Sequence, residues 1–243
     1  MDIMGLKTED LDVVYCVKGL ITNEELRYSL RSLRNLPHRK VWIFGGCPEW
    51  VNTEEVNFVP MEQTGNTKWK KSNSSVKRAC ETEGVSEDFI LFNDDFFVMQ
   101  PIDELETYYH KDLGYRVREI MTRGDVWGFS GYCRRLLDES RMLKYMGKPT
   151  LNYAVHIPMV FNKKKMLKLF EKYPDRVISR ALYGNYYEVG GVDTDDVKIY
   201  LLNEKPDKDS IFLSSTNDSF ARGEVGKYIR RKFKKASEYE KGE

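Results

Sequence analysis

Residues that build disulfide-linked or zinc-binding proteins are scarce in this sequence. Its four cysteines lie far apart and form no CxxC pair, and only three histidines occur in 243 residues. This spacing provides neither a disulfide framework nor a common zinc-binding pattern, and it is typical of reduced thiols in a cytosol. No apolar run approaches the roughly 20 residues of a transmembrane helix. We therefore expect a soluble, cytoplasmic protein without a membrane span.

The sequence also lacks an excess of charge of either sign. Its 39 Lys and Arg residues nearly balance 38 Asp and Glu residues, so the formal net charge is +1. Binding of a polyanion would therefore need a local patch. The basic segment near the C-terminus is one candidate for DNA contact, and a solvated terminal helix explains it equally well. The candidate contact residues are Arg230, Arg231, Lys234 and Lys235.

Short apolar segments alternate with helix-like polar segments over the first hundred residues. We predict strands at 12–19, 40–46, 56–61 and 89–92, and helices at 22–35 and 73–84. This order predicts parallel pairing and an α/β fold with a mainly parallel sheet between helices. The later residues are less regular. There we predict loosely helical residues at 142–147, helices at 163–173 and 175–187, a strand at 211–215 and a basic helix or tail at 226–242.

Local signals place the ends of these elements. Thr22 can cap the first helix, with Glu25 completing a capping box, and Leu26, Leu30 and Leu33 form its buried stripe. The second helix is expected to begin at Asn73 or Ser74 and to stop at Gly84. The helix at 175–187 is expected to stop near Gly184. Residues 193–196 predict a turn that leads into a helix, and residues 217–218 predict a turn.

Asn93, Asp94 and Asp95 interrupt the most strand-like run of the chain, "FILFNDDFFVM". Unpaired buried carboxylates are costly, so the pair needs a partner or a cavity. Two alternatives stay open. The acids can sit in a solvated turn between strands, or they can hold a hard divalent cation, which prefers oxygen ligands. Residues 15–19, 45–47 and 93–95 all lie at the carboxyl ends of predicted parallel strands, and open α/β sheets bind ligands at that edge.

Other polar residues have two interpretations as well. Arg27 and Arg31 are four residues apart, so they share a helix face with Arg34 nearby. They can clamp a phosphate or simply face solvent. His156 lies among apolar residues, where it can be an acid or base, a nucleophile, or a core histidine with satisfied hydrogen bonds.

Four sequence blocks resemble the Stealth family in residue type and order. They are "DVVYCVKG", "NEELRYSLRSL", "PEWV" and "VSEDFILFNDDFFVMQPI". That family comprises sugar-phosphate transferases of bacterial capsule synthesis and the lysosomal-enzyme GlcNAc-phosphotransferase. Weaker echoes follow in "AVHIP", the acids near Asp196, "TNDSF" and "SEYEK". The sequence is also similar to compact phage-encoded proteins called glycosyltransferases.

The resemblance implies a GT-A-like, Rossmann-like fold with a nucleotide-sugar donor and a divalent cation, Mn or Mg. It implies one transferase domain over 1–243, with a donor- and metal-binding half at 1–102 and an acceptor and catalytic half at 103–243. Asp94 and Asp95 would hold the metal, and His156 and Asp196 would serve catalysis. The implied donor-binding residues are Tyr15, Lys18, Arg27, Arg31, Asn73 and Asn93.

Two departures from the family pattern matter. Lys18 stands where the family usually has an acid or Asn, and Met159 stands where a second His is common. If that His performs phosphoryl transfer, its replacement favours transfer of a sugar alone. We therefore expect a UDP-type glycosyltransferase acting on a hydroxyl of a glycan or modified DNA, in a bacterial or phage-infected host. The alternatives are a sugar-1-phosphate transferase that releases UMP, and a non-catalytic nucleic-acid-binding module.

Overall fold

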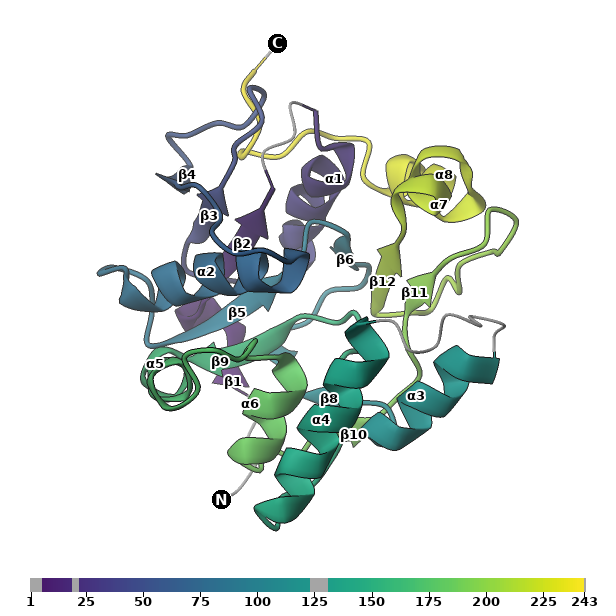
Figure 1. Cartoon of the computed structure of the whole chain (residues 1–243). Coiled ribbons are helices and arrows are strands. Elements are labelled where there is room, and N and C mark those ends of the chain that lie inside the picture. Colours follow the sequence, from purple (N-terminus) through teal and green to yellow (C-terminus); the bar gives the residue numbers. More distant parts are fainter. Residues whose placement is uncertain (1–5, 19–21, 123–130, 243) are drawn as a thin grey trace. The chain divides into compact units, whose positions relative to one another are not determined.

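The computed structural model describes residues 6–18, 22–122 and 131–242 (Figure 1). The chain forms two compact units. Unit 1 consists of Met1–Leu105, His156–Val177 and Val197–Glu243, and unit 2 consists of Glu106–Val155 and Ile178–Asp196. None of the helices in the described ranges combines the length and hydrophobicity needed to cross a bilayer.

A five-stranded sheet forms the centre of unit 1, in the order β4-β3-β2-β5-β9. The four parallel strands are β2 (Asp12–Val17), β3 (Val41–Gly45), β4 (Val56–Pro60) and β5 (Asp88–Phe92). Strand β9 (Met159–Asn162) adds an antiparallel edge beside β5. This confirms the predicted α/β class with a mixed, mainly parallel sheet. Gly19, the expected end of the first strand, lies outside the described residues.

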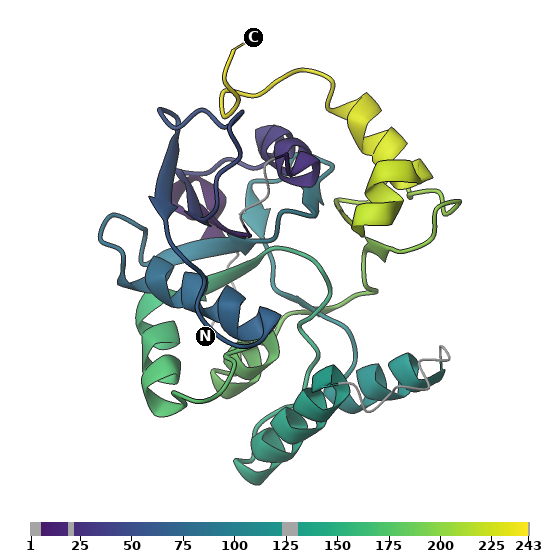
Figure 2. The same cartoon turned by 45° about the horizontal axis from the view of Figure 1, so that its top comes forward.

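Helices cover the sheet on both faces. The chain moves from β2 to β3 in one direction and from β4 to β5 in the other, and right-handed crossovers then place the connecting helices on opposite faces. Helix α1 (Glu24–Ser32) packs against β6, whereas α2 (Lys68–Glu81) packs on β2 and β3 beside α5 (Lys163–Lys172). The pairing of α2 and α5 is visible in both views (Figure 2).

The predicted stripe of α1 is confirmed, because Leu26, Leu30 and Leu33 are all buried. The predicted cap is wrong, since the side chain of Asn23 rather than Thr22 accepts the backbone N–H of Leu26. The predicted start of α2 is also wrong. Its cap is Thr67, and the first turns are exposed, so no apolar periodicity marked them.

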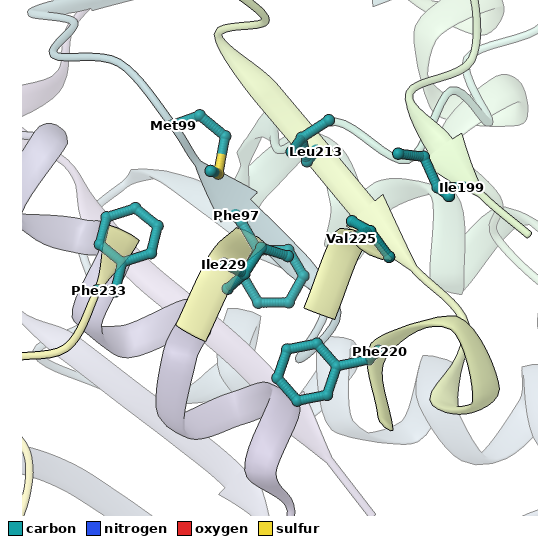
Figure 3. Packing of buried hydrophobic residues seen from close by; sticks show 8 residues of the cluster. All are labelled: Phe97, Met99, Ile199, Leu213, Phe220, Val225, Ile229 and Phe233. Carbon is teal, nitrogen blue, oxygen red and sulfur yellow. The ribbon is translucent and has the colours of Figure 1, made fainter. Parts of the chain in front are cut away.

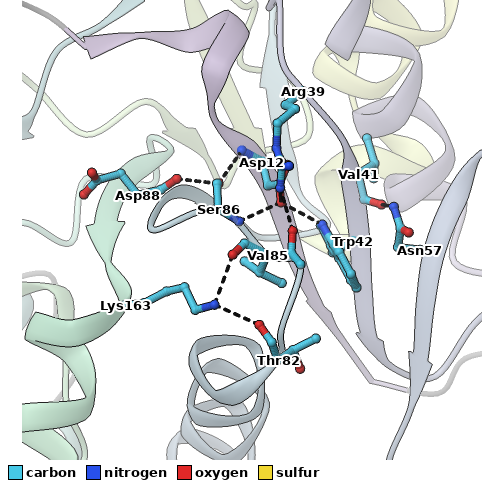
Figure 4. A network of polar contacts seen from close by, with 11 residues as sticks. Asp12, Arg39, Val41, Trp42, Asn57, Thr82, Val85, Ser86, Asp88 and Lys163 are labelled. Carbon is cyan, nitrogen blue, oxygen red and sulfur yellow. Dashed lines mark hydrogen bonds and ion pairs between the residues drawn. The ribbon is translucent and has the colours of Figure 1, made fainter.

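Asp12 explains why an acid can open a buried strand (Figure 4). Its carboxylate is fully buried and accepts hydrogen bonds from Arg39 Nε at 2.8 Å, Arg39 Nη2 at 2.7 Å, Trp42 Nε1 at 2.9 Å and the backbone N–H of Ser86 at 2.9 Å. These bonds tie β2 to β3 and to the start of β5 at the amino edge of the sheet, so the desolvated charge is fully compensated.

A second, three-stranded sheet of unit 1 has the order β11-β12-β6 and comprises β6 (Phe96–Val98), β11 (Lys198–Ile199) and β12 (Phe212–Ser215). Helices α7 (Asn217–Arg222) and α8 (Glu224–Lys232) pack on it. Phe97 and Phe220 stack at 5.8 Å in the buried cluster they share with α8 (Figure 3). The basic segment is thus helical over its first part. The turn expected at 217–218 is instead the first turn of α7, capped by Thr216.

Short elements complete unit 1. They are β1 (Leu6–Lys7), η1 (Thr8–Asp10), η2 (Leu33–Asn35) and β7 (Glu104–Leu105), with β1 pairing antiparallel to β7.

In its described residues, which exclude 123–130, unit 2 contains three helices and a short two-stranded ladder. They are α3 (Leu113–Thr122), α4 (Gly131–Tyr145), α6 (Arg180–Tyr186), β8 (Tyr108–Tyr109) and β10 (Val192–Asp193). Helix α6 ends at Tyr186, so the stop expected near Gly184 is correct to within two residues. Gly184 lets the helix pack closely on Tyr153, because a Cβ there would meet that ring at 2.5 Å. The helix expected after residues 193–196 is wrong, since that stretch joins two short strands.

Candidate functional site

The Asn-Asp-Asp stretch forms the corner by which the chain leaves one sheet of unit 1 and enters the other. Strand β5 ends at Phe92 and β6 begins at Phe96, whose backbone N–H donates to Asn93 O at 3.2 Å. The predicted turn is therefore confirmed, but its carboxylates are not solvated, because Asp95 is only 16% exposed and burial raises the pKa of Asp94. The turn does not compete with a site, because it holds both carboxylates at the carboxyl edge of the parallel sheet, where open α/β sheets bind ligands.

Asp94 is held by the start of helix α1. Its Oδ2 accepts a hydrogen bond from Asn23 Nδ2 at 2.8 Å, while Asn23 Oδ1 caps the helix. Asn23 has a φ of 32°, in the left-handed region. Burial raises the pKa of Asp94, and the neighbouring Asp95 charge acts in the same direction, against the hydrogen bond from Asn23. The carboxylate is thus fixed in place where a negative charge is unfavourable.

Asp95 faces a lysine from the second sheet. Its Oδ2 accepts from Lys198 Nζ at 2.6 Å, with the side chains 16% and 15% exposed. Its other oxygen, Oδ1, is buried and has no hydrogen-bond partner. A buried carboxylate oxygen without a partner is rare in folded proteins, and it is a common sign of a ligand or ion.

Glu25 is a third carboxylate at this position, and the sequence pattern assigned it only to a capping box with Thr22. It is 9% exposed and accepts from Ser215 Oγ at 2.9 Å. Burial raises the pKa of Glu25 to about 7, and the charges of Asp94 and Asp95 add to the effect, while Lys198 lowers it. Glu25 therefore lies within electrostatic reach of both aspartates.

A sequence signal for Glu25 did exist. Glu25, Ser29 and Ser32 recur at helical spacing, and all three are buried. Ser29 Oγ donates to Phe96 O at 2.5 Å, and Ser32 Oγ accepts from the Val98 backbone N–H at 3.0 Å. A polar stripe on the inner side of an otherwise apolar helix face thus attaches α1 to β6 and positions the turn.

These residues fit a divalent cation. Three carboxyl groups face one nearby ammonium, so acidic groups are in excess, and Asp95 Oδ1 offers an oxygen with no other partner. Within the described ranges, no group of three or more His, Cys, Asp or Glu side chains is arranged to hold a metal ion. A cation at Asp94 and Asp95 would therefore need further oxygens from water or substrate, which is common for Mg²⁺ at phosphate sites.

His156 lies beside the same turn. Its ring meets the ring of Phe96 edge-on at 6.3 Å, and its side chain is half-buried. Its φ is 52°, a strained value for a residue with a Cβ. Strained backbone at a non-glycine residue often marks a functional position. Asp196 belongs to unit 2, where its carboxylate lies 3.7 Å from Arg116 Nη2.

The two arginines of α1 have different surroundings. Arg31 donates Nε and Nη2 to the two oxygens of Glu240, both at 2.7 Å, and Nη1 to Phe233 O at 3.0 Å. Its side chain is only 11% exposed, so its donors are taken up by the C-terminal segment. Arg27 stacks on Trp50 at 4.7 Å, lies 3.6 Å from Glu240 and remains 35% exposed.

The other expected donor-binding residues do not share one environment. The Tyr15 side chain is fully buried and pairs its hydroxyl with Ser29 Oγ at 2.8 Å, so it presents no surface to a ligand. Lys18 and Asn93 are exposed at the ends of β2 and β5. Asn73 lies half-buried within α2 rather than at its start.

The four basic residues near the C-terminus that are candidates for DNA contact lie in different environments. Arg230 donates to Phe220 O at 3.0 Å and stacks on the Phe220 ring, so it ties α8 to the end of α7. Arg231, Lys234 and Lys235 are exposed. The backbone carbonyls of Lys234 and Lys235 accept from Arg31 and Arg34. The segment thus anchors itself to α1, while three of its four candidate side chains face solvent.

No family model matches the chain, and no curated protein matches it. The solved structures to which it is similar include glycosyltransferases. The galactosyltransferase LgtC, in complex with donor and acceptor sugar analogs, shares 11% sequence identity at a TM-score of 0.48, over 93% of this chain and 96% of LgtC. The glycosyltransferase GlyE from Streptococcus pneumoniae shares 10% sequence identity at a TM-score of 0.37, over 93% of this chain and 50% of GlyE. Both TM-scores lie below 0.5, so function has to be inferred from the site's own residues.

Proposed function

We propose that this chain is a metal-dependent glycosyltransferase that moves a sugar from a UDP-type donor to a hydroxyl acceptor. One observation carries the proposal. At the carboxyl edge of the parallel sheet, Asp94, Asp95 and Glu25 gather partly or fully desolvated negative charge, and Asp95 Oδ1 has no partner. Fixed carboxylates with an unpaired oxygen suit a cation that in turn attracts a diphosphate. The resemblance of the "NDD" and "NEELRYSLRSL" blocks to the Stealth family supports the same substrate class.

Asp94 and Asp95 would hold the cation, with Asn23 fixing the orientation of Asp94. A divalent cation there would supply positive charge for the leaving diphosphate. In the transfer, the bond between the sugar's anomeric carbon and the donor phosphate oxygen breaks, and a bond from that carbon to the acceptor oxygen forms. The acceptor proton passes to a base of the protein.

His156 is the base favoured by position, because it packs against the residue that follows Asp95. Arg27 is the arginine favoured for the donor phosphates, since its guanidinium is the more exposed of the two and charge-assisted hydrogen bonds to phosphate are strong. Arg31 would act on Arg27 and α1 through Glu240, which both arginines face. Asp196, the other catalytic residue that the resemblance implies, belongs to unit 2, and its role stays a prediction from that resemblance.

Sugar-1-phosphate transfer is the alternative reaction at the same site. It would break the bond between the two phosphates and release UMP. Met159, in place of the second His of the family pattern, favours transfer of the sugar alone. The nucleotide product separates the two reactions.

The test is a screen of UDP-sugars with Mn²⁺ or Mg²⁺, followed by chromatography of the nucleotide products. Release of UDP that stops on EDTA addition supports glycosyl transfer, and release of UMP supports the alternative. Acceptor arms contain oligosaccharides and hydroxymethylated DNA, with plain DNA as control. If no nucleotide sugar yields either product, with any acceptor or metal, the enzyme proposal fails.

A further inference from the structure

We propose that Lys198 is an internal counter-cation that competes with the divalent metal for Asp95 and turns to the donor phosphates once the metal is bound. The inference rests on the metal site of the proposed function and assigns a role to a residue outside it. Lys198 is not among the residues that the sequence pattern singled out. It comes from the second sheet of unit 1, a hundred residues after the aspartates.

The sheet register brings this lysine to the turn. Lys198 pairs with Ser214 on β12, and Ser214 pairs with Phe96 on β6. Phe96 directly follows Asp95. Three hydrogen-bonded strands therefore fix the backbone of Lys198 next to the turn. The position of this backbone does not depend on a loop. The resulting Nζ–Oδ2 distance of 2.6 Å is that of a charge-assisted hydrogen bond.

The charges around Asp95 make two cations difficult to hold together. Lys198 takes one oxygen of Asp95, and the partnerless Oδ1 is the other oxygen of the same carboxylate. A divalent ion on Oδ1 would lie within a few ångströms of the ammonium, at a site where both side chains are about one-sixth exposed. Repulsion between the two cations would be poorly screened there, so metal binding favours release of Lys198.

Once released from Asp95, Lys198 would bind the phosphates of the nucleotide-sugar donor. Its flexible four-carbon stem and three donors suit phosphate oxygens, which the metal would bring to the same place. Lys198 would then compete with the metal when the site is empty and support the nucleotide when the site is loaded. These two effects have opposite signs, so they can be separated from a merely structural role.

The experiment measures metal and nucleotide binding directly in the full chain. Mn²⁺ affinity is followed by electron paramagnetic resonance of free Mn²⁺, and UDP affinity by calorimetry at saturating Mn²⁺. Lys198→Met removes the charge but keeps a long side chain, and Lys198→Arg keeps the charge. Lys77→Met is the matched control, because Lys77 pairs with Glu81 on the surface of α2.

We expect Lys198→Met to tighten Mn²⁺ binding about tenfold and to weaken UDP binding at saturating Mn²⁺ about tenfold, a range typical of coupled sites. Lys198→Arg and Lys77→Met should stay within about twofold of wild type for Mn²⁺. Unchanged or weaker Mn²⁺ binding by Lys198→Met would show that Lys198 does not compete with the metal. Unchanged or tighter UDP binding would show that Lys198 does not bind the donor phosphates. In either case the metal site of the proposed function would stand. If no variant binds Mn²⁺, with or without UDP, the inference and the proposed metal dependence fail together.

Discussion

Arg31 and Glu240 form a two-pronged ion pair that closes the C-terminal segment onto α1, with Nε–Oε1 and Nη2–Oε2 distances of 2.7 Å. Their side chains are 11% and 7% exposed. Burial acts to raise the pKa of Glu240, but hydrogen bonds from Arg31 and Ser237 outweigh it and lower the pKa below its ordinary value. A carboxyl with a lowered folded-state pKa stabilises the fold above its unfolded pKa, and this stabilisation is lost as the pH falls through the folded value.

Glu240→Ala should therefore lower the free energy of unfolding at pH 7 by about 3 kcal/mol, because it leaves the guanidinium of Arg31 buried without its anion. Urea denaturation checks this value. Glu238→Ala is the control, since the Glu238 side chain is exposed two residues away. Equal stability of the two variants at pH 7 would contradict a structural role for the ion pair.

Asp12 should be the acid of unit 1 whose loss is most damaging to the sheet. Asp12→Asn replaces a carboxylate that accepts four hydrogen bonds from Arg39, Trp42 and Ser86. We expect a loss of about 2–3 kcal/mol, since the amide offers one acceptor oxygen where the buried carboxylate offered two, and the buried Trp42 indole and Ser86 N–H compete for it. Thermal unfolding is the measurement. Asp10→Asn, an exposed acid in the preceding turn, should change stability by less than about 0.5 kcal/mol.

Glu25 should make stability fall with rising pH. Burial and the nearby Asp94 and Asp95 raise its pKa from an ordinary value of 4.5 to about 7, so between these values the folded chain holds a proton that the unfolded chain releases. The contribution of this group is then fully present below pH 4.5 and is lost as the pH rises to about 7.

Glu25→Gln should remove this slope. The free energy of unfolding of the variant, minus that of wild type, should be roughly 1–3 kcal/mol higher at pH 8 than at pH 5. Urea denaturation at a series of pH values measures it. Glu24→Gln, at the neighbouring half-exposed position, should keep the wild-type slope. A wild-type slope in Glu25→Gln as well would mean that Glu25 ionises normally.

Asp94→Asn and Asp95→Asn should each lower kcat/KM for donor turnover about a thousandfold, because loss of charge stabilisation at a leaving group costs roughly 3–4 kcal/mol. Asp94→Asn should retain or slightly stabilise the folded state, since like charges repel at this turn. Asp95→Asn should fold but be less stable than wild type, because Lys198 then loses its anion at a largely buried position. Asp88→Asn is the matched control at the other end of β5, where Asp88 accepts from Asn162. Turnover at the wild-type rate in both site variants would exclude a role of the aspartates in donor chemistry.

His156 should tolerate glycine better than alanine. Its φ of 52° disfavours any residue with a Cβ, so His156→Gly should be about 1 kcal/mol more stable than His156→Ala. Both variants should lose acceptor transfer about a hundredfold if the imidazole is the base. Differential scanning calorimetry and product formation are the two measurements. Wild-type transfer rates in His156→Gly would assign the histidine to packing against Phe96.

The sequence by itself determined the sheet and which loops lie at its carboxyl edge. The strands predicted at 12–19, 40–46 and 89–92 contain apolar runs long enough to identify them, and the structure has strands at 12–17, 41–45 and 88–92. Their alternation with helices implies parallel pairing. Because parallel strands end at one edge of a sheet, the sequence alone places Asp94 and Asp95 at that edge. Helix starts were less predictable, since Thr67 and Asn23 act through single hydrogen bonds that other polar residues could equally supply.

Only the tertiary structure decided which charges meet at that edge. Glu25, Ser215 and Lys198 come from three elements spread over 190 positions, and no local pattern links them. The pairing of β11, β12 and β6 brings Lys198 to Asp95. Glu240 of the C-terminal segment binds the guanidinium of Arg31. Spacing in a sequence reports which residues share a face of one element. Partners across elements depend on sheet register and helix packing, which emerge only when the whole chain has folded.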